Sequence, residues 1–366
     1  MDQIDSMGLG FQLLLRLENF ACMKKISLLI SSLAVISLAF SQQRPYFTQY
    51  VLNNYLVNPA VAGIDNYTDI KMSHRMQWVG LQDAPVTTYV TVNGPTKKKD
   101  YDVDRVNATS IYPRGRNLML DIDPYQPDDA HSGMGFTMIN DKTGPLSRFA
   151  AYGTYAYHIN LNRNTNLSLG VSAGITQMSL DPSKLNFASG GDPATGSGTT
   201  KLNKINPDIS AGLWLYSTNY FIGLSAQQII AEKLYFTNYS EQSSAVQTKG
   251  KQIPHIFAQA GYKLNLNEEI SLLPSVMLRY VNPLPLSFDL NTKVDYRDIV
   301  WAGASYRYQD GFAAMFGVNL NYCINIGYSY DLTTSNLNLV SKGTHEILVG
   351  FLIGNKYNDY FPRNAW

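Results

Sequence analysis

Residues 165–176 read TNLSLGVSAGIT, and every second residue of this stretch is apolar. The apolar positions are Leu167, Leu169, Val171, Ala173 and Ile175, while Asn, Ser, Gly or Thr stands between them. A helix would scatter the apolar side chains around its circumference, whereas a strand places them all on one face, because successive Cβ atoms point in opposite directions. The stretch therefore predicts a β-strand with one apolar face and one small, polar face.

The same alternation recurs along the chain, for example at residues 208–215, 220–227 and 311–320. We expect about fourteen strands, an even number that suits a single-chain bacterial barrel. They are predicted near residues 68–78, 84–93, 131–140, 146–160, 165–180, 207–217, 219–229, 254–265, 268–281, 285–295, 298–309, 311–320, 321–331 and 344–353.

Alternation also occurs in soluble β-sandwiches, but three features favour an outer-membrane β-barrel. The strands have about ten residues, the length that a tilted membrane strand needs. The expected inner face is too small and polar to fill a sandwich core. Aromatic residues gather near strand ends, as in the interfacial girdles of barrels. The tyrosines concerned are Tyr152, Tyr155, Tyr157, Tyr216, Tyr220, Tyr306, Tyr308, Tyr328 and Tyr330.

The composition excludes several other classes of protein. Charged residues make up 16% of the 366 residues and the net charge is +1, which argues against a basic nucleic-acid-binding protein. The apolar fraction of 45% argues against disorder. A mean hydropathy of −0.16 is too polar for a bundle of membrane helices, but it suits a barrel in which only alternate residues face lipid.

The N-terminal region contains an export signal. Met23-Lys24-Lys25 precedes an apolar run at residues 26–40, and Ala39-Phe40-Ser41 ends it. Cleavage after Ser41 leaves Cys323 as the only cysteine, so no internal disulfide is expected. The expected organisation is an upstream extension (1–22), a signal peptide (23–41), a pre-barrel segment (42–66), a transmembrane barrel (67–354) and a C-terminal tail (355–366).

We find no motif that predicts catalysis, a cofactor or a metal site. The Gly-rich stretch 190–198 lacks the Lys of a phosphate-binding loop, the five histidines lack metal-ligand spacing, and no Gly-x-Ser-x-Gly occurs. Long connections at residues 96–130, 181–206 and 230–253 are typical of solvated loops, which are longer outside a barrel than on the periplasmic side.

Six short motifs occur in a fixed order. They are FTQY at 47–50, NPAVAG at 58–63, RMQWVG at 75–80, APVT at 84–87, NDKTGP at 140–145 and THEI at 344–347. This series closely resembles the PorP/SprF family of the type IX secretion system of Bacteroidetes, from about Gln43 to Gly354.

The resemblance implies a protein of the cell outer membrane, surrounded by its lipids, that aids the secretion or surface retention of proteins with C-terminal sorting domains, such as gliding adhesins. It also implies contact with periplasmic lipoprotein components of the secretion machine. Nucleic-acid binding is not expected from the charge balance, and enzymatic activity is not expected because no catalytic motif is found. The candidate partner positions in these motifs are Asn58, Pro59, Ala60, Gly63, Arg75, Gln77, Trp78, Gly80, Asn140, Asp141, Gly144, His345 and Glu346.

Structural roles for the same residues compete with partner contact. Asn58-Pro59 and Gly63 suit turns, because Pro restricts φ and Gly permits positive φ. Trp78 suits an interfacial anchor, while Arg75 and Gln77 are expected to point into the lumen. The aromatic segment 42–66 is expected either to plug the lumen or to contact periplasmic partners.

Two other functions remain open from the sequence. The Gly- and Ser-lined interior is also compatible with a channel for small solutes, which would conduct in a planar bilayer. A secreted β-sandwich adhesin would be released without detergent.

Overall fold

The computed structural model describes residues 47–96, 130–162, 165–184, 202–231, 252–267, 269–320, 323–334 and 339–355. The predicted signal peptide, the extension before it and the C-terminal tail after residue 355 lie outside this part of the chain. Among the described residues, no helix has the length and apolar character that crossing a bilayer requires.

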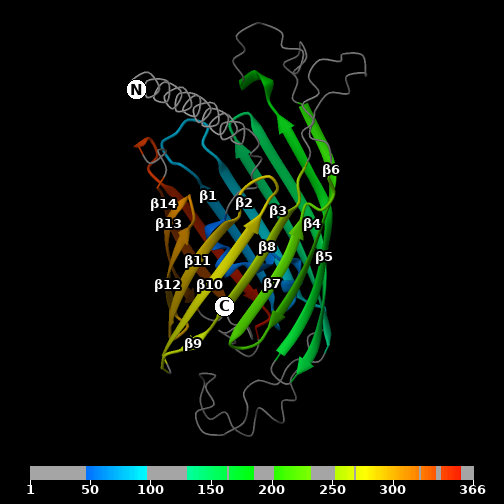
Figure 1. Cartoon of the computed structure of the whole chain (residues 1–366), viewed down its shortest axis with the longest axis vertical. Helices are drawn as coiled ribbons and strands as arrows, with labels where there is room; N and C mark the ends of the chain where they lie inside the picture. Colours follow the sequence, from blue (N-terminus) through cyan, green and yellow to red (C-terminus); the bar gives the residue numbers. More distant parts are fainter. Residues whose placement is uncertain are drawn as a thin grey trace, which may run out of the picture. The chain divides into compact units, whose positions relative to one another are not determined.

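The described chain is almost entirely antiparallel β-sheet (Figure 1). Its strands are β1 (Thr68–Met76), β2 (Val86–Pro95), β3 (His131–Thr143), β4 (Leu146–Asn162), β5 (Thr165–Leu180), β6 (Leu202–Tyr216), β7 (Tyr220–Gln227), β8 (His255–Tyr262), β9 (Leu264–Asn265), β10 (Ile270–Tyr280), β11 (Ser287–Tyr296), β12 (Val300–Arg307), β13 (Gly311–Leu320), β14 (Ile324–Thr333) and β15 (Thr344–Ile353). Four short 3-10 turns complete it: η1 (Thr48–Leu52), η2 (Asn54–Leu56), η3 (Pro59–Val61) and η4 (Pro182–Lys184).

The sheet closes on itself, because the first strand pairs with the last. Thr68 of β1 lies opposite Ile353 of β15, and every other strand pairs with its neighbour around the ring. Strands β8 and β9 are one wall strand, since Gly261 and Leu264 face β10 in the same register. The result is a closed antiparallel barrel of fourteen strands, as the sequence predicts.

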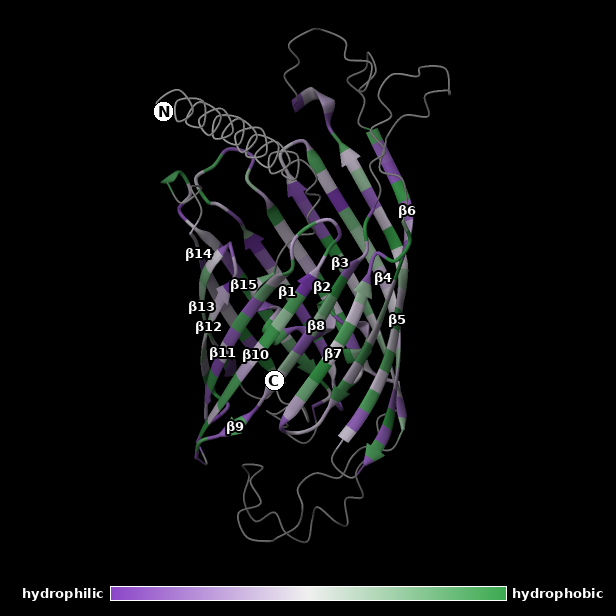
Figure 2. Cartoon of the chain, in the orientation of Figure 1, coloured by the Kyte–Doolittle hydropathy of each residue, from purple (hydrophilic) through white to green (hydrophobic). Residues whose placement is uncertain are grey.

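Burial along the strands confirms which face points outward. In β5 the apolar residues, such as Leu169 and Val171, are exposed, whereas Ser168 and Ser172 are buried inside. Figure 2 shows the same alternation of hydrophobic and hydrophilic residues along the ribbons. In an outer-membrane barrel this outward apolar band faces lipid.

The tyrosine girdle prediction is wrong at two positions. Tyr155 and Tyr157 are exposed on the outer face, but Tyr152 and Tyr216 are buried inside the barrel. The Tyr152 hydroxyl donates a hydrogen bond of 2.8 Å to Asp208. A tyrosine near a strand end faces lipid only when its position in the alternation points outward.

The two ends of the barrel differ. At the end where β1 begins and β15 finishes, which we call the turn end, the connections β4–β5, β6–β7, β9–β10, β11–β12 and β13–β14 are all short. Two of the long connections, 181–206 and 230–253, leave from the opposite end, the loop end. The third, 96–130, leaves from the turn end, because β2 finishes and β3 begins there. The interiors of all three connections lie largely outside the described residues.

Candidate functional site inside the barrel

Residues 47–66, which we call the plug, lie inside the barrel. They form η1, η2 and η3, drawn in blue within the ring of strands (Figure 1). The side chains from residue 48 to residue 64 are buried, apart from a partly exposed Leu52. The plug makes hydrogen bonds to β2, β4, β6, β8, β11 and β15, and so to opposite sides of the wall. The structure therefore places the segment in the lumen, the first of the two alternatives left open by the sequence.

Asn58 attaches the plug to the wall at β6 and β7. Its side-chain amide donates hydrogen bonds to the carbonyl oxygens of Leu213 at 2.9 Å and Leu224 at 3.2 Å. Its carbonyl oxygen accepts the Ala60 N–H at 3.0 Å, which caps η3, and Pro59 supplies the first residue of that turn. The NPAVAG motif is thus a structural connection between plug and barrel.

Two histidines bind the end of this motif, and a glycine lets the chain turn away from it. The Nε2 atoms of His158 and His131 lie 2.8 Å and 3.1 Å from the carbonyl oxygens of Ala62 and Gly63. The two imidazole rings are stacked with centroids 4.5 Å apart. Gly63 has a φ of +81°, a conformation that glycine adopts at no steric cost. The chain turns there towards β1, as the sequence predicts.

Glycines on the inner face of β3, β5 and β6 make room for the plug. A Cβ atom on Gly170 would collide with the backbone of Pro59 and Ala60, and one on Gly212 would collide with the Asn58 side chain. The small inner face was interpreted from the sequence as compatible with a channel lining. In the structure it is the surface against which residues 58–63 pack.

Thr48 attaches the other end of the plug to a buried ionic cluster. Its hydroxyl donates to Asp331 at 2.6 Å and accepts from Arg75 at 2.7 Å, while its backbone N–H donates to Glu346 at 2.9 Å. Arg75 also pairs directly with Asp331 at 2.6 Å and with Glu346 at 2.9 Å. Arg75 and Glu346 come from the RMQWVG and THEI motifs, which the fold brings together on neighbouring strands.

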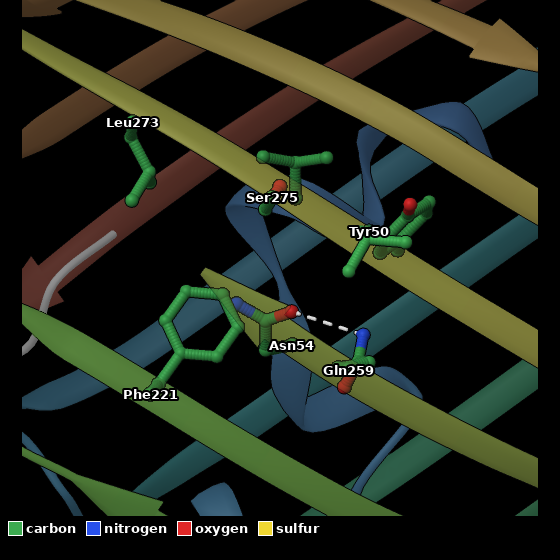
Figure 3. Close-up of a pocket in the computed structure, with 8 residues that line it drawn as sticks. Tyr50, Asn54, Phe221, Gln259, Leu273 and Ser275 are labelled. Atoms are coloured by element: carbon green, nitrogen blue, oxygen red, sulfur yellow. Dashed lines mark hydrogen bonds between the residues drawn. The ribbon is translucent and has the colours of Figure 1, made fainter. Parts of the chain in front are cut away.

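Between these two ends the plug packs on β7, β8, β10 and β11. Asn291 donates a hydrogen bond of 2.6 Å to the Tyr50 hydroxyl oxygen, and burial raises the pKa of this phenol above its ordinary value. Gln259 donates to Asn54 at 3.3 Å. Figure 3 shows a small pocket here, between Tyr50 and Asn54 of the plug and the side chain of Phe221.

Buried charge is concentrated on one side of the lumen. We call this side the charged wall, formed by β10, β11, β12, β14, β15 and β1. Among the described residues, the only buried Asp, Glu, Lys or Arg outside this wall is Asp208 on β6. The members on the charged wall are Asp69, Lys71, Arg75, Arg279, Asp289, Lys293, Asp295, Arg307, Asp331 and Glu346.

The remaining motif residues gather at the loop end, over the adjacent strands β15 to β4. The Gln77 N–H donates to Pro85 O, and the Trp78 N–H donates to Thr344, so these residues shape the β1–β2 connection. Gly80 has a φ of +102° in the same connection. Gly144 has a φ of +55° in the β3–β4 turn, and its N–H donates to Asp83 O.

Three motif side chains at the rim of the loop end point in different directions. Asn140 is exposed on the outer face, whereas Asp141 turns inward and accepts a hydrogen bond of 2.6 Å from Thr87. His345 lies outside, 2.6 Å from the Tyr328 hydroxyl. The expectation that Arg75 points into the lumen is confirmed, but Gln77 follows the end of β1 and belongs to the rim.

A scan against protein families matches residues 39–351 to the type IX secretion system membrane protein PorP/SprF. The chain belongs to the PorP/SprF family. A search of curated protein sequences finds no match. The family match covers the plug and nearly the whole barrel, and it confirms the resemblance of the six motifs and the outer-membrane location.

Several solved structures are similar to this PorP/SprF protein. The Pseudomonas putida toluene transporter TodX has 10% sequence identity and a TM-score of 0.45, with 85% of this chain and 95% of that chain covered. The Ralstonia pickettii toluene transporter TbuX has 9% identity and a TM-score of 0.44, with 81% and 92% covered. A Pseudomonas aeruginosa FadL homologue has 11% identity and a TM-score of 0.42, with 80% and 92% covered.

Several partners of the motif residues in this PorP/SprF protein were not predicted from its sequence. Thr48 lies in the FTQY motif without being singled out, and Asp331, Arg307 and His158 were not among the candidates. A titratable residue at an inward position of an alternating strand is the signal for Asp331, Arg307 and His158, whereas Thr48 lies outside the strands and carries no such signal. Within the described residues, no cluster of ligating side chains that could hold a metal ion is present.

Proposed function

We propose that this protein aids the secretion or surface retention of client proteins that carry C-terminal sorting domains, as a component of the type IX secretion system. The observation that carries the proposal is the family match across residues 39–351. The barrel with its outward apolar band supports a position in the outer membrane, where such clients must cross to the cell surface.

The occupied lumen supports an accessory role in place of a client-conducting pore. The plug bonds to both sides of the wall, so a polypeptide client has no free passage through this conformation. In this proposal the client or machine contacts lie on surfaces outside the lumen. Apart from 96–130, the connections at the turn end are short, and barrels carry short periplasmic turns, so in this proposal the turn end faces the periplasm. Periplasmic lipoprotein components would then meet the turn end.

The loop-end rim formed by Gln77, Trp78, Asn140 and His345 is the proposed contact surface on the outer side. These residues come from three separate motifs but lie over adjacent strands. Asn140 is exposed on the outer face of β3. Asn140→Ala, combined with Trp78→Ala, is expected to reduce client secretion while the barrel still assembles.

The matched control for this rim is Leu286→Ala, an exposed residue in the β10–β11 connection on the other side of the same end. It is expected to leave secretion at the wild-type level. Equal secretion by the rim variant and the control would place the contact elsewhere.

Deletion of the gene tests the function as a whole. Mass spectrometry of the cell surface and the medium should show loss of one or more large proteins with C-terminal sorting domains, and expression of the wild-type chain should restore them. An unchanged set of exported proteins, together with impaired uptake of small polar solutes, would instead support the solute channel.

A further inference from the structure

The outer face of the barrel changes character around its loop end. On β10 to β13, aromatic side chains occupy outward positions next to this end, namely Tyr280, Phe288, Tyr306 and Phe312. The ring centroids of Tyr306 and Phe312 are 5.0 Å apart, and those of Phe288 and Tyr306 are 6.5 Å apart. In an outer-membrane barrel, such a girdle marks the level at which hydrocarbon gives way to lipid headgroups.

On β15, β1, β2 and β3, polar side chains occupy the same level. We call this set the polar patch, and its members are His345, His74, Thr88, Asn140 and Lys142, each on the outer face near the loop end of its strand. Thr88 is paired with both His74 and Asn140, so these three lie in one row across neighbouring strands. The Nδ1 atom of His74 lies 2.9 Å from the Thr88 hydroxyl oxygen.

The polar patch is basic, because the carboxyl groups of the same strands point the other way. The acidic residues of β15 and β1 to β3 are Asp69, Asp141 and Glu346, and all three lie on the inner face. Lys142 is exposed on the outer face, and the exposed Asp83 belongs to the β1–β2 connection beyond the strands. An outward lysine beside imidazole, amide and hydroxyl groups suits a ligand that carries phosphate oxygens and sugar hydroxyls.

The outer face next to the patch, on the side of the turn end, is rich in methionine. Among the described residues, the exposed methionines are Met72, Met76, Met134 and Met138, and all of them lie on β1 or β3. Met72 and Met138 are both paired with Val90, so the short side chains of β2 lie between longer ones on either side. Methionine is flexible and polarisable, and a surface of this kind adapts to irregular apolar partners such as acyl chains.

From this arrangement we infer that β15 and β1 to β3 form a binding site for a phosphate-bearing glycolipid of the outer leaflet. The polar patch binds the headgroup, with Lys142 as the cation for a phosphate, and an acyl chain lies along β2 between Met72 and Met138. Charge at the membrane surface and flexible apolar side chains next to it match the two parts of such a lipid. The choice of leaflet rests on the orientation proposed for the secretion role. The binding itself does not, because it requires no client.

The headgroup contact is tested by His74→Gln combined with Lys142→Gln. The double variant removes the basic groups of β1 and β3 and keeps both side chains polar, and neither residue belongs to the proposed client contact surface. Delipidated protein in detergent is titrated with diphosphoryl lipid A, and native mass spectrometry measures the bound lipid. We expect a single lipid per wild-type barrel and an affinity about tenfold lower in the variant, the effect of losing one hydrogen bond between charged groups.

Arg297→Gln is the matched control, because it removes an exposed cation at the turn end, where Arg297 pairs with Glu269. It should bind diphosphoryl lipid A like the wild type. Lipid A without its phosphates should bind the wild type as weakly as the double variant binds the phosphorylated form. Equal affinities of the wild type and a folded double variant, or an affinity that does not depend on the phosphates, would overturn the proposal.

A photo-cross-link tests where the lipid lies. One chain carries a benzophenone side chain in place of Met138, and a second carries it in place of Phe316 on β13, which is the more exposed of the two positions. After loading with diphosphoryl lipid A in detergent, illumination should link the lipid mainly at position 138. Equal yields at the two positions would mean that the lipid covers the barrel without a site. Client secretion is not measured in any of these experiments, so their outcome is separate from that of the gene deletion.

Discussion

The two sides of the lumen contact the plug through different kinds of residues. On β3, β5 and β6, the inner face carries glycine and serine, and the plug backbone lies directly on the strands. On the charged wall, the long side chains of Arg75 and Arg307 reach inward and donate hydrogen bonds to the Thr48 hydroxyl of the plug. The contact of residues 58–63 is close-packed and largely neutral, whereas the contact of Thr48 is with charged groups.

This difference teaches that a polar inner face does not by itself indicate an open pore. The inner side chains of β5 and β6 are small because residues 58–63 of the plug occupy the space in front of them. The charges of the opposite wall are buried because they pair with one another. A close-packed contact resists any added atom, whereas an ionic contact depends on every charge keeping its partner.

The largest effect is expected for Arg75→Met. The substitution leaves Asp331 and Glu346 buried without their common cation, and breaking a buried pair in this way typically costs about 3–5 kcal/mol. Urea unfolding of the protein in lipid vesicles, followed by tryptophan fluorescence, measures the loss. The exposed Arg297→Gln variant should unfold like the wild type. A similarly small loss for Arg75→Met would show that the cluster is hydrated in the folded protein.

The next largest effect is expected for Gly170→Ala on the close-packed side. The added methyl group meets the backbone of Pro59 and Ala60, and overpacking of this kind costs about 1–3 kcal/mol. Gly153→Ala is the matched control, because Gly153 is exposed on β4 and an added Cβ atom there meets nothing within 4 Å. Equal unfolding free energies for the two variants would contradict close packing between plug and wall.

Asn58→Ala is expected to cost about 1–2 kcal/mol, because it removes the cap of η3 and two bonds to strand carbonyls. Limited proteolysis should then cut the chain near residues 58–63, which are protected in the wild type. Continued protection together with an unchanged unfolding free energy would mean that the glycine contacts alone hold residues 58–63 in place.

The smallest effect is expected for Asn53→Ala, where the plug meets β2. It removes one neutral hydrogen bond to Thr91, with a cost of about 1 kcal/mol. A double-mutant cycle with Thr91→Val isolates the pair. Coupling close to zero would mean that water replaces the bond at this position.

The strands and their inward and outward faces follow from local sequence, because a period of two is a property of the strand itself. The predicted strand at 165–180 coincides with β5, and that at 344–353 coincides with β15. The positive φ of Gly63 was also foreseeable, since the residue type permits it. The errors at Tyr152 and Tyr216 came from judging position along the strand without the alternation.

The partners inside the lumen could not be read in the same way. Thr48 meets Asp331 and Glu346 across almost the whole length of the chain, and only closure of the ring between β1 and β15 brings them together. The glycines of β5 and β6 look alike whether they face water or a plug. Alternation of side chains is a local property, so the sequence predicts it. What fills the enclosed space depends on contacts that exist only after the barrel has closed.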